Sequence, residues 1–449
     1  MRGAGQGNYY LQLAREDYYL QGGEPPGQWH GVGAKLFSLS GTVEKDDLRN
    51  LLSGFSPKEQ VALVQNAGAK DRQSGWDLTF SAPKSVSVLW SQVGRNVRGK
   101  IEAAQQAAVE TALDFLEANC AFTRRGRGGE GLERTPAIFA TFEHGTSRAC
   151  DPQLHTHALL LNLAFRADGT TGTVVSREFF RNKMLAGAIY QAELAYRLSS
   201  VLGVAIERTK ASFEVKGVPR DLCDTFSKRR QEILQELRAR GVDNAVAAKI
   251  AALNTRQQKE HVPREKLLES WREVGQALGW THKQAEALLQ KPAPDHKRDR
   301  LAKVRELLEA LKNKGLKDGK LLFAAVKIGL QQGFSGNDVL TALATTRKPL
   351  LEVRTKILFP NAPNWSPVKD LALPYLKFQI SPTKHWRWGK VISERKVGPL
   401  KLQLREKYLF PNAPKWSPVH AVSLPAFRLK PEAPARAAAP TKETPAHDH

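Results

Sequence analysis

The chain has 449 residues, 41% of them hydrophobic, which is enough for two to four folded domains with a sizeable core. Its 68 Lys and Arg against 45 Asp and Glu give a formal net charge of +23, which favours a polyanionic partner such as nucleic acid over a surface that is basic only for solubility. Three cysteines without a CxxC pair argue against a disulfide framework or a zinc ribbon. With no signal peptide and no apolar run near the roughly 18 residues of a membrane span, we expect a cytoplasmic protein without membrane insertion.

The first elements in chain order combine tyrosine pairs, strand patterns and one clear helix. Residues 7–23 hold two tyrosine pairs between glycines, and residues 56–68 have a short helical pattern. Residues 76–90 have β-type residues at both ends with Pro83 between them, and their last part fits either a strand or the first turn of a following helix. Residues 99–119 are rich in Ala, Glu and Gln with apolar residues at helical spacing, which predicts a helix.

One glycine-containing segment approaches a phosphate-binding loop without matching it. Residues 94–101 (GRNVRGKI) resemble the pattern G-x-x-x-x-G-K-[ST], but Ile101 replaces the hydroxyl that would bind Mg²⁺. We find no other loop of this kind, and we predict no helicase or ATPase domain and no bound nucleotide cofactor.

The middle of the chain predicts a hairpin, two strands and two helices. Residues 123–135 (TRRGRGGEGLERT) form a basic loop or hairpin tip. Residues 137–144 and 154–165 alternate or run apolar as strands do, whereas residues 178–201 and about 218–240 have helical patterns.

The last third of the chain is its most basic part. Residues 291–449 hold 30 Lys and Arg against 13 Asp and Glu. A proline-rich motif at 358–374 recurs at 409–425, a period of 51 residues, and two copies favour paired small modules over a solenoid. The predicted organisation is a main folded domain over 1–292, a basic helical region over 293–350, a basic two-repeat region over 351–430 and a disordered tail over 431–449.

Three histidines form the clearest candidate site. Side chains at i and i+2 of a strand point to one face, so His155 and His157 in DPQLHTHALLLN present their imidazoles together. His144 ends the preceding strand pattern and completes a triad if 137–144 pairs with 154–163. Three imidazoles with open positions favour a divalent-metal site over histidines that merely pack in a core.

Two further residue types, an aspartate and tyrosines, indicate which reaction such a metal could assist. Asp77 begins a β-type run, where its carboxylate can orient a metal-binding histidine or accept a proton, although a lone Asp there is more often a turn residue. A tyrosine hydroxyl becomes a nucleophile when a base removes its proton and a metal neutralises the phosphate it attacks. The two tyrosine pairs therefore favour phosphate chemistry, with ordinary packing as the alternative.

At this point the first 290 residues resemble the relaxase domain of MobF-type conjugative relaxases (TrwC/TraI-like), which belong to the HUH endonucleases. The resemblance is carried by NYY…EDYY (8–19), DLTFSAPKSVS (77–87), HGTSRACDPQLHTHALLLN (144–162) and AELAYRL (192–198). It implies an α+β fold, an antiparallel sheet palm with helices packed on one side and a helical fingers region over about 178–290. A basic C-terminal extension follows in this chain.

The resemblance also implies a reaction and the residues that carry it. Relaxases of this family nick one DNA strand at a plasmid transfer origin, hold the 5′ phosphate on a tyrosine, and later rejoin the strand. Tyr9 is then the first nucleophile and Tyr18 the second, with accessory roles for Tyr10 and Tyr19. Asp77 matches the acidic residue of the family. The metal triad corresponds to His144, His155 and His157, with Mg²⁺ or Mn²⁺ expected and Zn²⁺ as the alternative.

Single-stranded or hairpin DNA at a transfer origin is the expected substrate. The coupling machinery of type IV secretion is an expected partner, and any unwinding then comes from a separate helicase. Candidate DNA contacts, each of which also fits an ordinary surface charge, are Lys84, Arg124, Arg125, Arg127 and Arg148.

Two alternatives to this enzyme stay open. Only eight residues precede Tyr9, whereas the family usually has a strand there, which would suit a DNA-binding protein with a degenerate relaxase site. A metal-dependent phosphodiesterase that uses water in place of tyrosine is the second alternative. Residues 299–430 are expected either to bind DNA without sequence preference, with Trp386 and Trp388 stacking on bases, or to dock to the transfer machinery.

Overall fold

The computed structural model describes residues 24–58, 61–147, 149–209, 212–239, 262–291 and 297–346, together with 388–397, 400–408 and 423–431. The chain divides into two compact units, the first made of residues 1–349 with 363–368 and the second of 350–362 with 369–449. Within the described residues, no helix is both long and apolar enough to cross a membrane.

A four-stranded antiparallel sheet forms the centre of the first unit. Its order is β1-β5-β6-β2, with the bounds Gln28–His30 for β1, Phe139–Thr146 for β5, Pro152–Leu161 for β6 and Gly75–Ser81 for β2. The predicted pairing of 137–144 with 154–163 is confirmed, because β5 and β6 are neighbours and His144 lies directly opposite His155. This register brings the predicted metal ligands to one place on the sheet.

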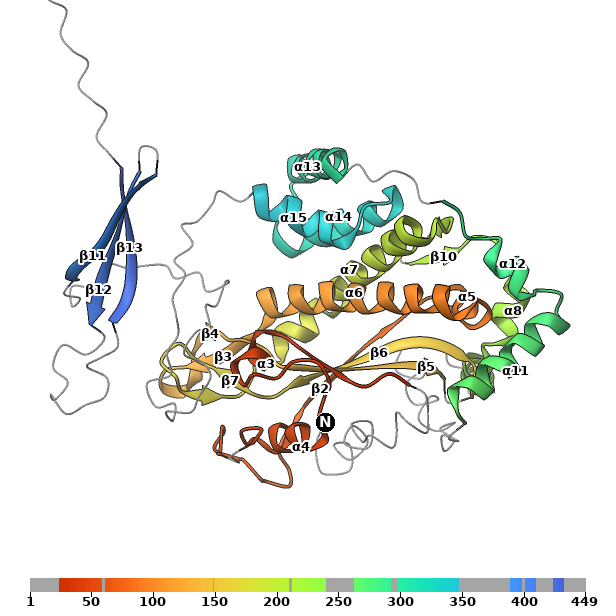
Figure 1. Ribbon diagram of the computed structural model, residues 1–449, viewed down its shortest axis with the longest axis horizontal. Coiled ribbons are helices and arrows are strands. Elements are labelled where there is room, and N and C mark those ends of the chain that lie inside the picture. The colour runs from red at the N-terminus through yellow and green to blue at the C-terminus, as the bar shows by residue number, and fades with distance from the viewer. Residues whose placement is uncertain are drawn as a thin grey trace, which may run out of the picture. The chain divides into compact units, whose positions relative to one another are not determined.

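Helices cover one face of the sheet, and the hydrophobic core lies between the two layers (Figure 1). The covering helices are α5 (Lys84–Gln92), α6 (Arg95–Cys120) and α7 (Arg177–Leu202). Leu154, Ala158 and Leu160 of β6 point into this core, where they are fully buried. Burial of each large apolar side chain contributes about 1.5–3 kcal/mol. The predicted α+β fold, with helices on one side of an antiparallel sheet, is confirmed.

Several predicted elements are confirmed and one is wrong. The helix over 99–119 lies within α6, and the helix over 178–201 lies within α7. The open choice at 76–90 resolves into strand β2 followed by α5, with Pro83 as the N-cap residue of that helix. The helical pattern over 56–68 is wrong, because the nearby helix is α4 (Lys45–Ser53) and the described residues after it form turns.

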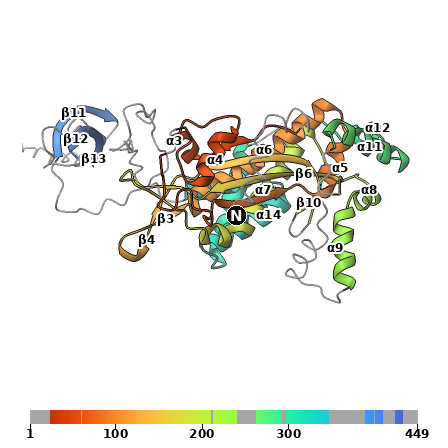
Figure 2. The same ribbon diagram turned by 90° about the horizontal axis from the view of Figure 1, so that it is seen from below.

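The single helix predicted over 218–240 is two helices, α8 (Arg220–Thr225) and α9 (Lys228–Ala239). Tertiary contacts explain the break. The carbonyl of Phe226 accepts a hydrogen bond from the Lys84 ammonium, and the carboxylate of Asp151 accepts one from the Lys228 amide. A carboxylate stabilises the N-terminus of a helix by accepting from its first amide groups. Asp151 therefore favours the start of a new helix at Lys228. Figure 2 shows α9 projecting from the body of this unit.

Smaller elements complete the first unit. Short helix α3 (Val32–Leu36) follows β1, and α11 (Arg264–Ala277) and α12 (His282–Glu286) follow α9 in the described chain. Three pairs of short antiparallel strands are also present. The first pair is β3 (Phe122–Arg125) with β4 (Gly131–Arg134), and the one-turn helix η1 (Arg127–Gly129) lies between these two strands in the chain. The others are β7 (Ala164–Phe165) with β8 (Thr171–Gly172) and β9 (Ile206–Arg208) with β10 (Phe213–Val215). The basic segment predicted as a loop or hairpin tip is thus the β3–β4 hairpin.

Three further helices pack onto the outer side of α7 (Figure 1). These are α13 (Lys297–Asn313), α14 (Asp318–Gln332) and α15 (Gly336–Thr346). Arg300 lies over the ring of Tyr196 of α7 at 4.7 Å and pairs with the buried Asp338 at 3.0 Å. The Asn337 amide donates to Glu193 of α7. The predicted domain boundary between 292 and 293 stays a prediction.

We expect Asp338→Ala to destabilise the protein by about 2–3 kcal/mol, because it removes a buried carboxylate that binds both Arg300 and the Ser335 amide. Thermal unfolding of the full chain measures the loss. Glu309→Ala is the matched control, since its pair with Lys312 is exposed and should contribute less than about 1 kcal/mol. Equal unfolding temperatures for the two variants would show that α13–α15 is not held through Asp338.

The second unit contains a three-stranded antiparallel sheet of order β11-β12-β13. Its strands are β11 (Trp388–Val397), β12 (Leu400–Tyr408) and β13 (Ser423–Pro431). Only the last residues of the second repeat, from Ser423, fall in this sheet. The first repeat, the second repeat up to residue 422, Trp386 and the tail beyond Pro431 lie outside the described residues, and the side chain of Trp388 is not described.

Candidate metal centre

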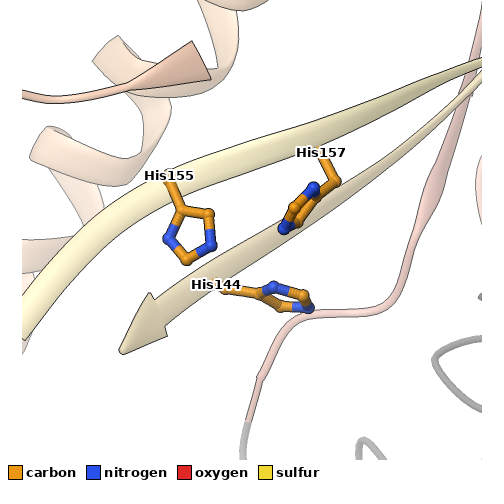
Figure 3. Close-up of side chains that lie close together, drawn as sticks. All are labelled: His144, His155 and His157. Atoms are coloured by element: carbon orange, nitrogen blue, oxygen red, sulfur yellow. The ribbon is translucent and has the colours of Figure 1, made fainter. Parts of the chain in front are cut away.

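The three predicted histidines converge on the sheet face opposite the helices. His155 and His157 project from β6, and His144 projects from the neighbouring β5 (Figure 3). The ring centroids are 5.1 to 5.3 Å apart, and one ligating nitrogen from each ring lies within 4.8 Å of the others. Strand alternation produces this arrangement, because Leu154, Thr156 and Ala158 face the core while the residues between them face the cluster.

Hydrogen bonds fix which nitrogen of two of these rings can bind a metal. The Nδ1 atom of His155 is 2.7 Å from the Gln153 carbonyl, which can only accept, so this nitrogen carries the proton. The Nδ1 atom of His157 is 2.9 Å from the Asp77 carboxylate, which accepts in the same way. In both rings the lone pair therefore lies on Nε2, and a carboxylate behind a metal-binding histidine is the usual supporting arrangement.

The spacing and chemistry of these donors fit a metal ion. Three nitrogens at about 2.1 Å from one ion lie up to about 4 Å apart, so a small inward movement of the rings suffices. Three neutral imidazoles leave coordination positions for phosphate oxygens or water. His144 is 2% exposed, so the cluster is closed on the β5 side.

A buried polar network supports the histidine strand from the core side. Thr156 stands between His155 and His157 and accepts a hydrogen bond from Gln105 of α6. The Tyr190 hydroxyl of α7 donates to the same Gln105 at 2.6 Å. Burial raises the pKa of Tyr190 far above its usual value, so this tyrosine stays protonated and is no candidate nucleophile.

We expect Asp77→Asn to weaken Mn²⁺ binding by about 10- to 100-fold, because the amide holds His157 in the required tautomer less well than the carboxylate does. Titration calorimetry of the full chain measures the affinity. Asp46→Asn is the control, as this carboxylate is 80% exposed and pairs with Arg49 on the surface. A dissociation constant unchanged by Asp77→Asn would separate Asp77 from any metal site.

The predicted nucleophiles and some predicted DNA contacts lie outside the described part of the chain. These are Tyr9, Tyr10, Tyr18, Tyr19 and Arg148, and the side chain of Arg127 is likewise not described. Arg124 and Arg125 lie on the β3–β4 hairpin. The Arg125 guanidinium pairs with Glu133 and Asp168, and the Arg124 guanidinium donates to a carbonyl of its own hairpin.

Lys84 has a structural position that the sequence did not suggest. Its ammonium donates to the carbonyls of Pro152 and Phe226, at 3.0 and 2.9 Å, and so joins α5 to the start of β6 and the end of α8. Burial lowers the pKa of this lysine, with Asp151 acting in the opposite direction. These contacts give the Lys84 ammonium a structural role, and its role as a DNA contact stays a prediction.

Sequence reasoning missed a group of buried charges near the cluster. Arg264 of α11 binds Glu102 of α6 and lies 3.5 Å from Glu24. Burial raises the pKa of Glu143, the neighbour of His144, to about 8, with Glu102 adding to the rise and Arg264 opposing it. The three partners are separated by 78 and 162 residues in the chain, so no local pattern could have pointed to them.

Comparisons with known proteins all point to one family. A family model described as TrwC relaxase matches residues 4–278. The Multifunctional conjugation protein TraI of Escherichia coli is 35% identical over 289 residues, which is 61% of this chain. TraI of E. coli strain K12 is 33% identical over 296 residues, or 62% of this chain. The chain spans only 16% of the length of either relative.

Solved structures agree in fold. A conjugative relaxase TrwC in complex with oriT DNA, with copper bound, superposes with a TM-score of 0.56 at 32% identity, over 63% of this chain and 98% of that one. TrwC complexed with a 27-mer DNA comprising the recognition hairpin and the cleavage site gives a TM-score of 0.54 at the same identity and coverage. A metal-free form of the TrwC complex matches equally well, with a TM-score of 0.55.

Proposed function

Because the chain belongs to the TrwC relaxase family, we propose that it nicks one strand of DNA at a plasmid transfer origin and becomes covalently joined to it. The observation that carries this proposal is the histidine cluster with Asp77 behind it, on a sheet that matches a relaxase solved with oriT DNA. The substrate is single-stranded or hairpin DNA, in keeping with the hairpin and cleavage site in the TrwC complex.

The proposed reaction is a transesterification. The Tyr9 hydroxyl loses its proton and its oxygen attacks phosphorus, while the bond from phosphorus to the 3′ oxygen breaks. The products are a 5′-phosphotyrosyl link and a free 3′-hydroxyl, and Tyr18 performs the same attack on the strand that arrives when transfer ends. These tyrosines, with Tyr10 and Tyr19 as accessory residues, are assigned from the family motif NYY…EDYY alone.

His144, His155 and His157 would hold the divalent metal, with Mg²⁺ or Mn²⁺ expected and Zn²⁺ as the alternative. A bound divalent ion supplies charge to the non-bridging phosphate oxygens as negative charge develops there. Asp77 holds the His157 ring through its Nδ1 atom, so its supported role is to orient that histidine. A role as the base for tyrosine is the other role that the family resemblance suggests.

The DNA is expected to contact basic side chains of this unit. Arg124 on the β3–β4 hairpin and Lys84 at the start of α5 are the candidates from the described residues, and Arg127 and Arg148 are candidates from the sequence. Arg125 shares its charge with two carboxylates, which weakens it as a phosphate contact. We also propose a type IV secretion coupling machinery and a separate helicase as partners of the transfer reaction.

A covalent-adduct assay tests this function. Labelled single-stranded oligonucleotides that tile the replicon encoding the chain are mixed with the full protein and Mn²⁺, then run on a denaturing gel. The expected result is one oligonucleotide that yields a protein–DNA adduct, lost when EDTA removes the metal. Cleavage without an adduct would indicate a phosphodiesterase that uses water, and binding without cleavage a degenerate relaxase.

A further inference from the structure

A second group of interacting charged and aromatic side chains lies beside the histidines. We define the Arg264 cluster as Arg264, Glu24, Glu102, Trp90 and Gly145. The Arg264 guanidinium lies over the Trp90 ring, 4.9 Å from its centroid, and binds the Glu102 carboxylate. The Trp90 indole donates to the same carboxylate at 2.8 Å. Glu24 reaches Arg264 with one oxygen at 3.5 Å and accepts a hydrogen bond from the Gly145 amide with the other at 3.1 Å.

The Arg264 cluster joins three parts of the chain whose relative positions matter for the proposed reaction. Glu24 comes directly after residues 1–23, which carry the proposed nucleophiles. Gly145 follows His144 on β5, and its contact with Trp90 is so close that any added side chain would collide with the ring. Arg264 is the first residue of α11 and lies within the proposed fingers region of about 178–290. The Arg264 guanidinium therefore links a helix of the proposed fingers region to Glu24, and Glu24 in turn binds the histidine strand.

We propose that Arg264, acting through Glu24, is a positioning residue that fixes the chain directly after the tyrosine segment against β5, the strand that carries His144. This inference rests on the proposed function. One oxygen of the Glu24 carboxylate holds the Gly145 amide while Arg264 restrains the other oxygen. Loss of that restraint lets the tyrosine oxygen shift relative to the phosphate, and an error of about 1 Å in a reacting geometry costs on the order of 100-fold in rate.

Burial and charge argue for positioning over stability. The side chains of Arg264 and Glu24 are 10% and 8% exposed, so both charged groups are largely shielded from solvent. A buried ion pair contributes little net stability compared with apolar residues of the same volume, and its best-attested use is to specify one arrangement. Removing one partner alone leaves a buried charge unpaired, so the test below uses Gln, which keeps a hydrogen-bonding group at each position. Helix α11 also has other anchors, since Trp271 packs on Trp90 and donates to the Cys150 carbonyl. The helix should therefore stay docked when Arg264 is changed.

Single-turnover kinetics on the full chain test the inference. The variants are Arg264→Gln, Glu24→Gln and the double variant, with Arg272→Gln as the control, because Arg272 lies on the same helix and donates to the Val93 carbonyl. With the oligonucleotide that forms the adduct, we expect each single variant to slow adduct formation by about 10- to 100-fold at saturating DNA. DNA affinity should stay within about threefold, and the double variant should be no slower than the slower single variant, as expected for one shared interaction.

A second readout works without catalysis. Hydrogen exchange of peptides containing Gly145 should quicken in Glu24→Gln and Arg264→Gln and stay at the wild-type rate in Arg272→Gln. If the wild-type chain forms no adduct, the proposed function fails, and the Gly145 exchange still decides whether Arg264 holds Glu24 against β5. Wild-type rates of adduct formation in both single variants, or unchanged exchange at Gly145, would overturn the inference.

Discussion

Tyr9→Phe combined with Tyr18→Phe is expected to abolish the covalent protein–DNA adduct, with a fall of at least about 10³-fold in its rate of formation. The change removes only two hydroxyl oxygens, so the aromatic rings can still stack and the metal ligands are untouched. Binding of single-stranded DNA should therefore persist. Denaturing gels with the adduct-forming oligonucleotide measure the first quantity and fluorescence anisotropy the second.

The single variants distinguish the two tyrosines. Tyr9→Phe should abolish the initial nick, whereas Tyr18→Phe should nick normally and fail to process a second strand. Tyr196→Phe is the control, since this tyrosine lies on α7 under the Arg300 guanidinium and outside the network that supports the histidine strand, and it should leave adduct formation unchanged. Full activity in the double variant would mean that water or another residue attacks the phosphate, and the relaxase chemistry would be lost.

His155→Ala and His157→Ala are expected to have the second-largest effect. Each removes one of three nitrogen donors that lie within 4.8 Å of one another. Mn²⁺ affinity should fall by more than the roughly 10- to 100-fold expected for Asp77→Asn, because a ligand is lost and not only its support. Several kcal/mol of transition-state stabilisation depend on the metal, so adduct formation should slow by about 10³-fold.

The control for these variants is His282→Ala. This histidine lies on α12, away from the cluster, and bonds to the Gln92 carbonyl. Titration calorimetry and adduct kinetics on all three variants should separate it from the two ligands. Mn²⁺ affinity that stays at the wild-type value in both His155→Ala and His157→Ala would place the metal elsewhere.

The sequence predicts this site well because its geometry is local. Two histidines two positions apart on a strand must share a face, and one antiparallel neighbour brings His144 opposite His155. Asp77 follows from the same logic, because β2 is the next strand of the sheet. Helices α6 and α7 were also predictable, since both are long and have a strong helical pattern.

Other features depend on contacts between distant residues and leave no local pattern. Lys84 and Asp151 break the helix predicted over 218–240 into two by binding its backbone near Phe226. The Arg264 cluster is assembled from chain segments that are far apart, and only the fold brings its charges together. The short pattern over 56–68 was misleading because apolar spacing in a brief segment does not distinguish a helix from packed turns.

Mass spectrometry of the trypsin-digested adduct tests the central claim most directly. Cleavage after Arg2, Arg15 and Lys35 places Tyr9 and Tyr10 on one peptide and Tyr18 and Tyr19 on the next. We predict a nucleotide joined through its 5′ phosphate to Tyr9 in the first peptide, formed only when divalent metal is present. A phosphate attached to any other residue type, or an adduct that forms equally well in His155→Ala with EDTA present, would contradict the account.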